Sequence, residues 1–355
     1  MGLTLAELGG WPHILGSLSR GEDLTGEQAS AAMTDVLGGE ATPSQIAGFI
    51  VALRIKGETV EEMTGLLRTM LEFGERVTVP DAVLPRLVDT CGTGGDRSGT
   101  INVSTIAGLV VAGAGAPVCK HGNRAASSAC GSADVLEALG VVADLGPDGV
   151  ARCIAEAGIG FCFAPRYHPA MRHAGPVRRE LGVPTVFNFL GPMANPARVR
   201  RQVLGVSDPA MADKVLDVLA ANGAERALVV YGHDGLDELT TTTTSTVREL
   251  RNGETHRYVV DPVELGLKRA ERSDLAGADA PRNAELARRV LDGEPGPQRD
   301  VVLLNAAAGL VAAGVADDLA EGLAAATAAI DDGRAAAALE RLVATSRAAA
   351  PTSTS

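Results

Sequence analysis

The chain has 355 residues, which is more than a single hydrophobic core usually supports, so its length predicts two domains. Hydrophobic residues make up 46% and charged residues 21%, a globular composition that excludes a disordered chain, and no apolar run reaches the length of a membrane span. The formal net charge of −12 disfavours nucleic acid as a partner, because an acidic surface repels a polyanion. An anionic substrate therefore needs a local basic pocket or a metal.

The N-terminal segment and the cysteines give no sign of export. Residues 1–24 have neither a basic flank before an apolar core nor a small-residue cleavage site, so we expect a cytoplasmic protein. The five cysteines are odd in number and form no C-x-x-C pair, which argues against a disulfide frame or a thiolate zinc site. We expect all five to be small buried apolar residues.

The first eighty residues are predicted to be helical. Capping boxes begin at Thr25, Thr42 and Thr59, because each threonine is followed three residues later by Gln or Glu. Apolar residues then repeat at helical spacing behind the second and third boxes, and Gly57 and Gly74 lie where these helices should stop. Because so few helices enclose little core, we expect them to bury an apolar face against a second subunit, which predicts a homodimer.

From about residue 85 short β-rich runs alternate with helical segments, which predicts an α/β domain with a mainly parallel central sheet flanked by helices. The predicted strands are 87–90, 117–119, 159–164, 202–206 and 227–231, a hairpin is expected at 246–250 and 255–260, and the predicted helices are 104–114, 132–139, 148–157, 209–221 and several within 282–345. We expect residues 1–80, joined by a segment near 168–200, to form a small helical domain and residues 81–350 to form the α/β domain.

Residues 89–140 carry the chemistry of an anion-binding site. Gly92, Gly94 and Gly95 lack a Cβ and let backbone N–H groups approach a phosphate, and the helix predicted to follow them offers its N-terminus. Lys120 follows the next predicted strand. Because ligands of an open parallel sheet bind at the carboxyl ends of strands, two such loops on one rim suggest a ligand with two phosphate groups.

The common nucleotide motifs are absent. No Gly-Lys-Ser/Thr follows the glycine turn, so a Walker-type triphosphate site is not predicted. Arg97 stands where the dinucleotide fingerprint requires its third glycine. Neither an NTPase nor a dehydrogenase is indicated.

Seven motifs occur in the order and approximate spacing of a known family. They are GTGGD at 92–96, NVST at 102–105, KHGNRAASS at 120–128, GSADVLEALG at 131–140, HPAMRHAGPVRRELG at 168–182, FNFLGPMANP at 187–196 and LDEL at 236–239. On these motifs the chain, from about residue 20 to 340, resembles the anthranilate phosphoribosyltransferases, which have a nucleoside phosphorylase-like fold. The resemblance implies a transferase of tryptophan biosynthesis that moves the phosphoribosyl group of 5-phosphoribosyl-1-pyrophosphate to the amine of anthranilate and releases pyrophosphate.

The resemblance assigns donor binding to three segments. They are the glycine turn (residues 92–96), the start of the next helix, and the loop that begins at Lys120 (residues 120–128, the lysine loop). The residues are Gly92, Gly95, Asp96, Thr100, Asn102, Val103, Ser104, Thr105, Lys120, His121, Gly122, Asn123, Arg124, Ala125, Ala126, Ser127, Ser128 and Ser132. The alternatives are an ordinary strand-to-helix turn and a surface lysine with its ammonium in solvent. We favour donor binding, because a turn needs fewer glycines and a phosphate would supply a counter-charge for the lysine.

For the acceptor, the resemblance implies one cation for the carboxylate and apolar walls for the ring. The residues are Gly92, Asn123 and Arg178, with Gly191 and Pro192 beside the ring. Arg178 and Arg179 point about 100 degrees apart on a helix predicted to begin near Pro169, so we expect at most one of them to face the site and the other to be solvated. His168 and His173, five residues apart, do not share a helical face, and we interpret both as structural.

The resemblance also implies Mg²⁺, with two ions per subunit. Asp237 and Glu238 would hold one ion and Ser104 the second, and adjacent carboxylates are hard oxygen donors that suit Mg²⁺. The alternatives are a solvated acidic pair in a polar loop and a serine that only caps a helix. No catalytic base is predicted, because the aniline nitrogen of anthranilate is neutral at pH 7 and positioning supplies the acceleration.

Two rival functions stay open at this point. A pyrimidine nucleoside phosphorylase shares the expected architecture, but its lysine loop would differ from KHGNRAASS. A non-enzymatic nucleic-acid-binding relative would carry a basic patch and decayed donor motifs. The acidic balance and the intact GTGGD and LDEL motifs argue against the second rival.

Overall fold

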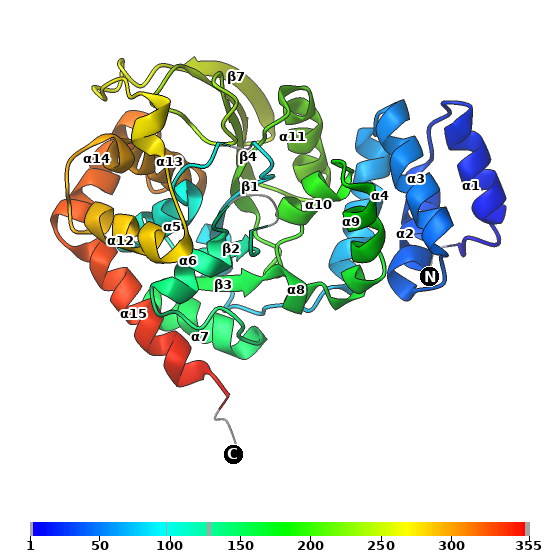
Figure 1. Ribbon diagram of the computed structural model, residues 1–355, viewed down its shortest axis with the longest axis horizontal. Coiled ribbons are helices and arrows are strands. Elements are labelled where there is room, and N and C mark those ends of the chain that lie inside the picture. Colours follow the sequence, from blue (N-terminus) through cyan, green and yellow to red (C-terminus); the bar gives the residue numbers. More distant parts are fainter. Residues whose placement is uncertain (1–2, 97, 126–128, 352–355) are drawn as a thin grey trace.

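The computed structural model describes residues 3–96, 98–125 and 129–351. A group of N-terminal helices lies at one end of the molecule and a larger α/β part at the other (Figure 1). The N-terminal helices are α1 (Gly10–Ser19), α2 (Gly26–Gly38), α3 (Pro43–Lys56) and α4 (Val60–Phe73). Helix α1 precedes the first predicted capping box and is not among the helices that the sequence predicts.

The three capping boxes are confirmed. Thr25, Thr42 and Thr59 are the N-caps of α2, α3 and α4, and each threonine side chain accepts a hydrogen bond from the N–H three residues later. Gly57 and Gly74 are the C-cap residues of α3 and α4, as predicted. Local sequence therefore sets both ends of these two helices.

The central sheet has seven strands in the order β3-β2-β1-β4-β5-β6-β7. Its strands are β1 (Val88–Gly92), β2 (Val118–Gly122), β3 (Ile159–Phe163), β4 (Arg201–Gly205), β5 (Arg226–Gly232), β6 (Ser245–Arg251) and β7 (Glu254–Val260). Strands β1 to β5 are parallel, whereas β6 and β7 pair antiparallel as the predicted hairpin. The expected mainly parallel sheet is confirmed, and every observed strand begins within one residue of its predicted start.

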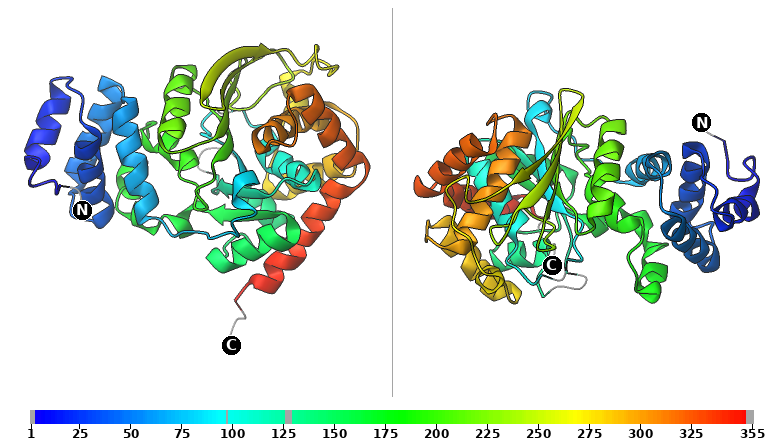
Figure 2. Two further views of the ribbon diagram at one scale, coloured as in Figure 1. Left: turned by 180° about the vertical axis from the view of Figure 1, so that it is seen from behind. Right: turned by 90° about the horizontal axis from the view of Figure 1, so that it is seen from above.

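Helices cover both faces of this sheet (Figure 2). The helices that follow α4 in the chain are α5 (Val103–Gly113), α6 (Ser132–Ala138), α7 (Pro147–Ala157), α8 (Ala164–Tyr167), α9 (Gly175–Leu181), α10 (Phe187–Met193), α11 (Ala212–Ala221), α12 (Ala280–Leu291), α13 (Pro297–Ala313), α14 (Leu319–Asp331) and α15 (Arg334–Ala349), and not all of them contact a strand. The single helix predicted from about Pro169 is wrong. A 3-10 turn covers Pro169–Arg172 and α9 starts at Gly175, because Pro176 has no N–H with which to continue an earlier helix.

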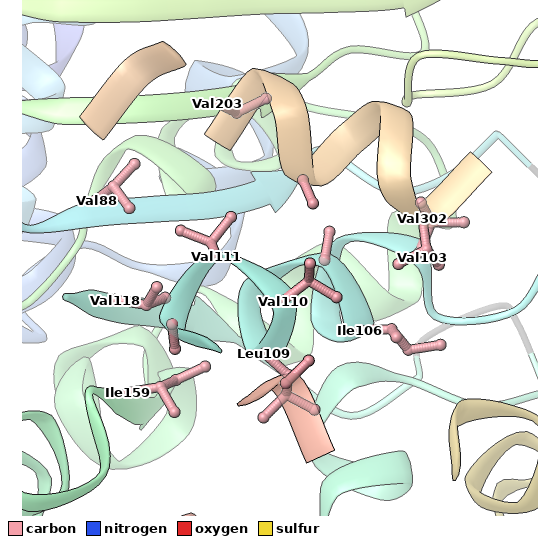
Figure 3. Close-up of a cluster of buried hydrophobic side chains, with 14 of the residues drawn as sticks. Val88, Val103, Ile106, Leu109, Val110, Val111, Val118, Ile159, Val203 and Val302 are labelled. Atoms are coloured by element: carbon pink, nitrogen blue, oxygen red, sulfur yellow. The ribbon is translucent and has the colours of Figure 1, made fainter. Parts of the chain in front are cut away.

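Successive residues of the central strands enter two different cores. In β4, Val203 belongs to the core formed with α5 and α13, and Leu204 belongs to the core formed with α4 and α11. Figure 3 shows Leu109, Val110 and Val111 of α5 among apolar side chains of the first four strands. Burial on both faces explains why these strands are apolar runs rather than alternating ones.

Two short helices connect the N-terminal helices to the sheet. Helix α9 contacts α3, and α10 contacts α4, although more than a hundred residues separate each pair in the chain. Ala174 and Val177 lie in the same buried cluster as the apolar residues of α2 and α3. Among the described residues the five cysteines are buried, as expected, and no helix has the length and apolarity to cross a membrane.

Candidate active site

A cavity of about 820 Å³ opens where β1 and β2 end, between the start of α5 and the helices α8 to α10. It gathers the predicted residues Gly92, Gly95, Asp96, Thr100, Asn102, Val103, Ser104, Thr105, Lys120, His121, Gly122, Asn123, Arg124, Ala125, Ser132, Arg178, Gly191, Pro192, Asp237 and Glu238. Ala126, Ser127 and Ser128 lie outside the described residues. Segments far apart in the chain therefore meet at the carboxyl edge of the sheet, as open parallel sheets lead one to expect.

The glycine turn is shaped by contact with the loop that follows β5. A Cβ on Gly92 would overlap the Asp237 carboxylate, and the N–H of Gly94 donates to Asp237 Oδ2 at 2.7 Å. Gly94 and Gly95 have φ values of +66° and +81°, which favour glycine. The turn thus needs glycines for its own packing, a reason that the motif alone did not show.

Asp237 and Glu238 are not a solvated acidic pair. Asp237 is only 9% exposed, and Glu238 Oε1 accepts a hydrogen bond from the N–H of Ser104 at 3.2 Å. Burial and then the nearby Asp96 raise the pKa of Asp237 to about 7, and burial and then Asp237 raise the pKa of Glu238 well above its ordinary value. Two adjacent carboxylates with raised pKa values form a place where a cation is favoured.

Lys120 is buried rather than solvated, with 2% of its surface exposed. Its Nζ donates to the carbonyl of Thr90 and, at 3.2 Å, to Ser104 Oγ. The surface-lysine alternative is therefore wrong. The ammonium therefore lies between β1, which leads into the glycine turn, and the start of α5.

Ser104 does not cap its helix. Asn102 is the N-cap of α5, and its side chain makes no capping hydrogen bond. The Ser104 hydroxyl contacts Lys120 and its backbone N–H contacts Glu238. Ser104 thus lies between the buried lysine and the acidic pair.

Arg124 points away from the acidic pair. Its guanidinium forms ion pairs with Asp134 at 3.0 Å and with Glu137 at 2.7 Å, both on α6, and it lies 5.4 Å from the ring centre of Phe163. Asn123 beside it is exposed. The outer part of the lysine loop is thus held against α6.

Arg178 and Arg179 differ in burial, but both line the cavity, so the prediction that at most one of them faces the site is wrong. Arg178 is partly buried with its guanidinium carbon 5.2 Å from the ring centre of Phe187, whereas Arg179 is exposed. Burial lowers the pKa of Arg178. Both side chains line the cavity, but only Arg178 combines a cation with an adjacent aromatic wall.

Two histidines, His121 and His168, line the cavity and lie against each other. His168 Nε2 donates to the carbonyl of Ala194 at 3.0 Å, and its ring lies 5.2 Å from that of His121. Burial lowers the pKa of His168 to about 4 and that of His121 well below its ordinary value. His173 packs so closely against Gly39 that a Cβ there would touch its ring. The structural interpretation of His168 and His173 agrees with these contacts.

Comparison with known proteins identifies the family. Models of a glycosyl transferase family match in two parts, a helical bundle domain over residues 12–74 and an a/b domain over residues 84–336. The anthranilate phosphoribosyltransferase of Salinispora arenicola is 54% identical over 312 residues, 88% of each chain. That of Chloroflexus aggregans is 53% identical over 330 residues, 92% of this chain and 96% of the relative. The chain belongs to the anthranilate phosphoribosyltransferase family.

Solved structures of anthranilate phosphoribosyltransferases have the same fold. The crystal structure of the Thermus thermophilus protein matches with a TM-score of 0.89 and 45% identity, over 94% of this chain and 99% of that one. The Saccharomyces cerevisiae protein, solved in complex with PRPP and Mg, matches with a TM-score of 0.85 and 26% identity over 95% of this chain and 98% of that one. The fold assignment therefore rests on both sequence and structure.

One buried group beneath this phosphoribosyltransferase cavity was missing from the sequence prediction. Asp89 is fully buried, and its carboxylate accepts hydrogen bonds from the N–H of His121 at 3.1 Å and from Asn195 Nδ2 at 2.8 Å. Asn195 Nδ2 also donates to the carbonyl of Cys119 at 2.8 Å. Burial raises the pKa of Asp89 to about 6 while the charge of Lys120 opposes the shift. The sequence does carry a sign of this role, because Asp89 lies within a predicted buried strand and a buried carboxylate requires hydrogen-bond partners.

Proposed function

We propose that this chain transfers the phosphoribosyl group of 5-phosphoribosyl-1-pyrophosphate to the amine of anthranilate, giving N-(5-phosphoribosyl)anthranilate and pyrophosphate in tryptophan biosynthesis. The supporting observation is that one cavity combines the glycine turn, a buried lysine, a carboxylate pair and a partly buried arginine. The yeast relative has been solved in complex with PRPP and Mg and with 4-fluoroanthranilate. Family membership and cavity chemistry thus favour the same reaction.

The donor lies, in this proposal, across the carboxyl ends of β1 and β2. The glycine turn and the N-terminal end of α5 face the pyrophosphate, since the dipole of a helix N-terminus favours an anion. The N–H groups of Gly94 and Ser104 donate to Asp237 and Glu238, so binding would engage the pyrophosphate together with this acidic pair. Lys120 supplies positive charge from below, and Asn123, Ser132 and the lysine loop bind the ribose and its phosphate. Support comes from the shared cavity that these groups line.

Asp237 and Glu238 fit a hard divalent cation. Among the described residues no group of three or more His, Cys, Asp or Glu side chains is arranged around a metal, so a cation here would need further oxygen ligands from Ser104, water or the donor's phosphates. That is the usual coordination of Mg²⁺. When bound, Mg²⁺ offsets the negative charge of the leaving pyrophosphate. We assign two ions per subunit to Asp237, Glu238 and Ser104.

Arg178 binds the carboxylate of anthranilate in this proposal. Phe187, Gly191 and Pro192 form the wall beside the ring, and Asn123 and the Gly92 backbone lie near the amine. An aromatic acid needs one cation and apolar walls, and this part of the cavity offers both. The chain's own contribution is orientation, since the neutral amine attacks ribose C1 without prior deprotonation as the C1–O bond to pyrophosphate breaks, and the nitrogen then loses its proton to water or to the released pyrophosphate.

We further propose a homodimer formed through the N-terminal helices in the cytoplasm, with no nucleic acid or membrane partner. Ile55 on α3 is 82% exposed, which is unusual for a large apolar side chain and supports an interface on this helix. The helical domain would comprise residues 1–80 with the segment near 168–200, and the α/β domain residues 81–350. The contacts of α9 and α10 with α3 and α4 support this grouping.

The direct test is the loss of anthranilate fluorescence after the phosphoribosyl donor and Mg²⁺ are added to purified protein. We expect a chelator to abolish the loss and added Mg²⁺ to restore it. The matched control replaces both substrates with a pyrimidine nucleoside and phosphate. Phosphorolysis of the nucleoside, with anthranilate left untouched, would establish the phosphorylase rival instead.

A further inference from the structure

Three arginines occupy one row at the opposite end of the sheet from the candidate active site. Arg201 on β4 pairs in register with Arg226 on β5, and Arg226 pairs with Arg251 on β6. Residues in register point to the same face, on strands only about 4.8 Å apart. Like charges directly opposite one another are destabilising, so this row needs anions nearby.

The row lines a cavity of about 550 Å³, which is within the usual size of small-molecule sites. Gly314, the left-handed C-cap of α13 with a φ of +75°, forms part of the wall. A Cβ at Gly314 would lie 2.9 Å from Arg201 Nη1 and 3.9 Å from Arg226 Nη1. The helix end therefore leaves the guanidinium groups the space that a side chain would fill.

Arg226 has the most unpaired donors of the row, although Arg201 Nε is also buried without a hydrogen-bond partner among the described residues. Arg226 is only 8% exposed, and its Nε and Nη2 are buried without a hydrogen-bond partner in the described part of the chain. Glu249 Oε1 lies 3.8 Å from Arg226 Nε, too far for a hydrogen bond, while Glu249 Oε2 accepts from the Tyr258 hydroxyl at 3.1 Å. Buried donors of a charged group are costly to leave unpaired.

The flanking arginines are already partly engaged. Arg201 Nη1 donates to the carbonyl of Ala312 at 3.1 Å, and Arg251 donates to the carbonyl of Asp317 at 3.0 Å and to its carboxylate at 3.3 Å. Glu225, which also lines the cavity, is 2.8 Å from Arg200 and 3.9 Å from Arg201. These contacts hold the two outer guanidinium groups in place and leave the central one without a strong partner.

We propose that this cavity binds a tetrahedral oxyanion, either inorganic phosphate or the phosphate group of a monoester, with Arg226 at the centre and Arg201 and Arg251 at its sides. A guanidinium group offers parallel donors that match two oxygens of such an anion, and a dianion offsets more than one of the crowded charges. The inference is independent of the proposed reaction, whose groups lie at the other end of the strands.

The test is calorimetric titration of the full-length protein with inorganic phosphate at low salt. Phosphate also competes with the donor, and that component is measured separately as competitive inhibition of the transfer reaction. We expect a second binding event in the wild type, weakened about tenfold or more by Arg226→Gln, with competitive inhibition unchanged. Arg257→Gln, on exposed β7, makes the same charge change outside the cavity and should leave both events intact.

Arg251→Gln is the second variant, because Arg251 is 36% exposed at the rim and its loss does not disturb the core. It should also weaken the second event. Glycerol 2-phosphate distinguishes the two ligand sources, since tighter binding than phosphate indicates a monoester and weaker or equal binding indicates the free ion. A wild type with no second event, or one that Arg226→Gln and Arg251→Gln leave unchanged, would overturn the proposal.

Discussion

The two ends of the central sheet concentrate opposite charges. At the carboxyl ends of the strands, Asp237 and Glu238 lie side by side with raised pKa values. At the other end, Arg226 lies between two further arginines with buried donors that have no partner among the described residues. In both places the fold brings like charges together and leaves room beside them. Each cluster has neighbours of opposite charge, Lys120 at one end and Glu225, Glu249 and Asp317 at the other, and the adjoining cavity leaves room for a further ion, a cation at the first end and an anion at the second.

The largest expected effect is that of Asp237→Asn, which removes one charge of the acidic pair at the carboxyl ends of the strands. The substitution keeps an acceptor for the Gly94 N–H but removes a negative charge. We expect kcat to fall by about 100-fold to 1,000-fold and the Mg²⁺ concentration for half-maximal rate to rise. The KM for anthranilate should change less than the Mg²⁺ dependence. Steady-state rates across a Mg²⁺ titration measure this.

The matched control for Asp237→Asn is Arg251→Gln at the basic end, which should leave the Mg²⁺ titration as in the wild type. An unchanged Mg²⁺ titration in Asp237→Asn would remove Asp237 from the metal ligands.

The buried histidines at the carboxyl end predict a pH effect on stability. His168 has a folded pKa of about 4, below its unfolded value, so the folded state resists protonation. The contribution of His168 to the free energy of unfolding should therefore be full above about pH 6.5 and fall by up to about 3 kcal/mol as the pH drops toward 4, whereas the raised pKa values of Asp89 and Asp237 act in the opposite direction. Urea unfolding at several pH values measures the slope.

His168→Gln should flatten this pH dependence, whereas His256→Gln, at an exposed position on β7, should not. The same change in stability from pH 7 to 4 in the wild type and in His168→Gln would contradict the assignment of His168 as a buried neutral group.

Close packing of the glycine turn predicts a third effect. Gly92→Ala places a methyl group against the Asp237 carboxylate, and we expect a loss of about 2 kcal/mol in the free energy of unfolding together with weaker Mg²⁺ activation. Gly38→Ala, at the end of α2 with open space around it, should be neutral or slightly stabilising. Equal stability of the two variants would show that the turn adapts without cost.

The smallest expected effect concerns the acceptor. Arg178→Ala should raise the KM for anthranilate about tenfold, the loss expected for one hydrogen bond to a charged group, with less change in the KM for the donor. Arg179→Ala, the exposed neighbour, provides the control. Equal effects of Arg178→Ala on both KM values would count against its contact with the carboxylate.

Features that depend on neighbouring residues in the chain were predictable. Thr25, Thr42 and Thr59 cap three helices because a capping box is complete within four residues. The strands were located to within one residue at their starts because buried parallel strands are short apolar runs. The helix boundary at Pro176 is equally local, but the predicted helix runs from about Pro169 through Arg178 and Arg179 without a break. That prediction is wrong at this point.

Features that depend on distant segments were not predictable in the same way. The glycines of the turn suggested a ligand, but only the folded chain shows that Gly92 also makes room for Asp237. Asp89 stood in the sequence without a role until Asn195 and the His121 N–H were found beside it. Each contact joins residues that are more than thirty positions apart.

By itself the sequence determined three helix caps, the strand positions, the family motifs and part of the cavity lining, because each is written in short stretches of chain. The tertiary structure alone decided which charges are buried and which meet. Arg201, Arg226 and Arg251 belong to no motif, and only the order and register of β4, β5 and β6 put them side by side. Burial and strand register are collective properties of the fold, so no local pattern can encode them.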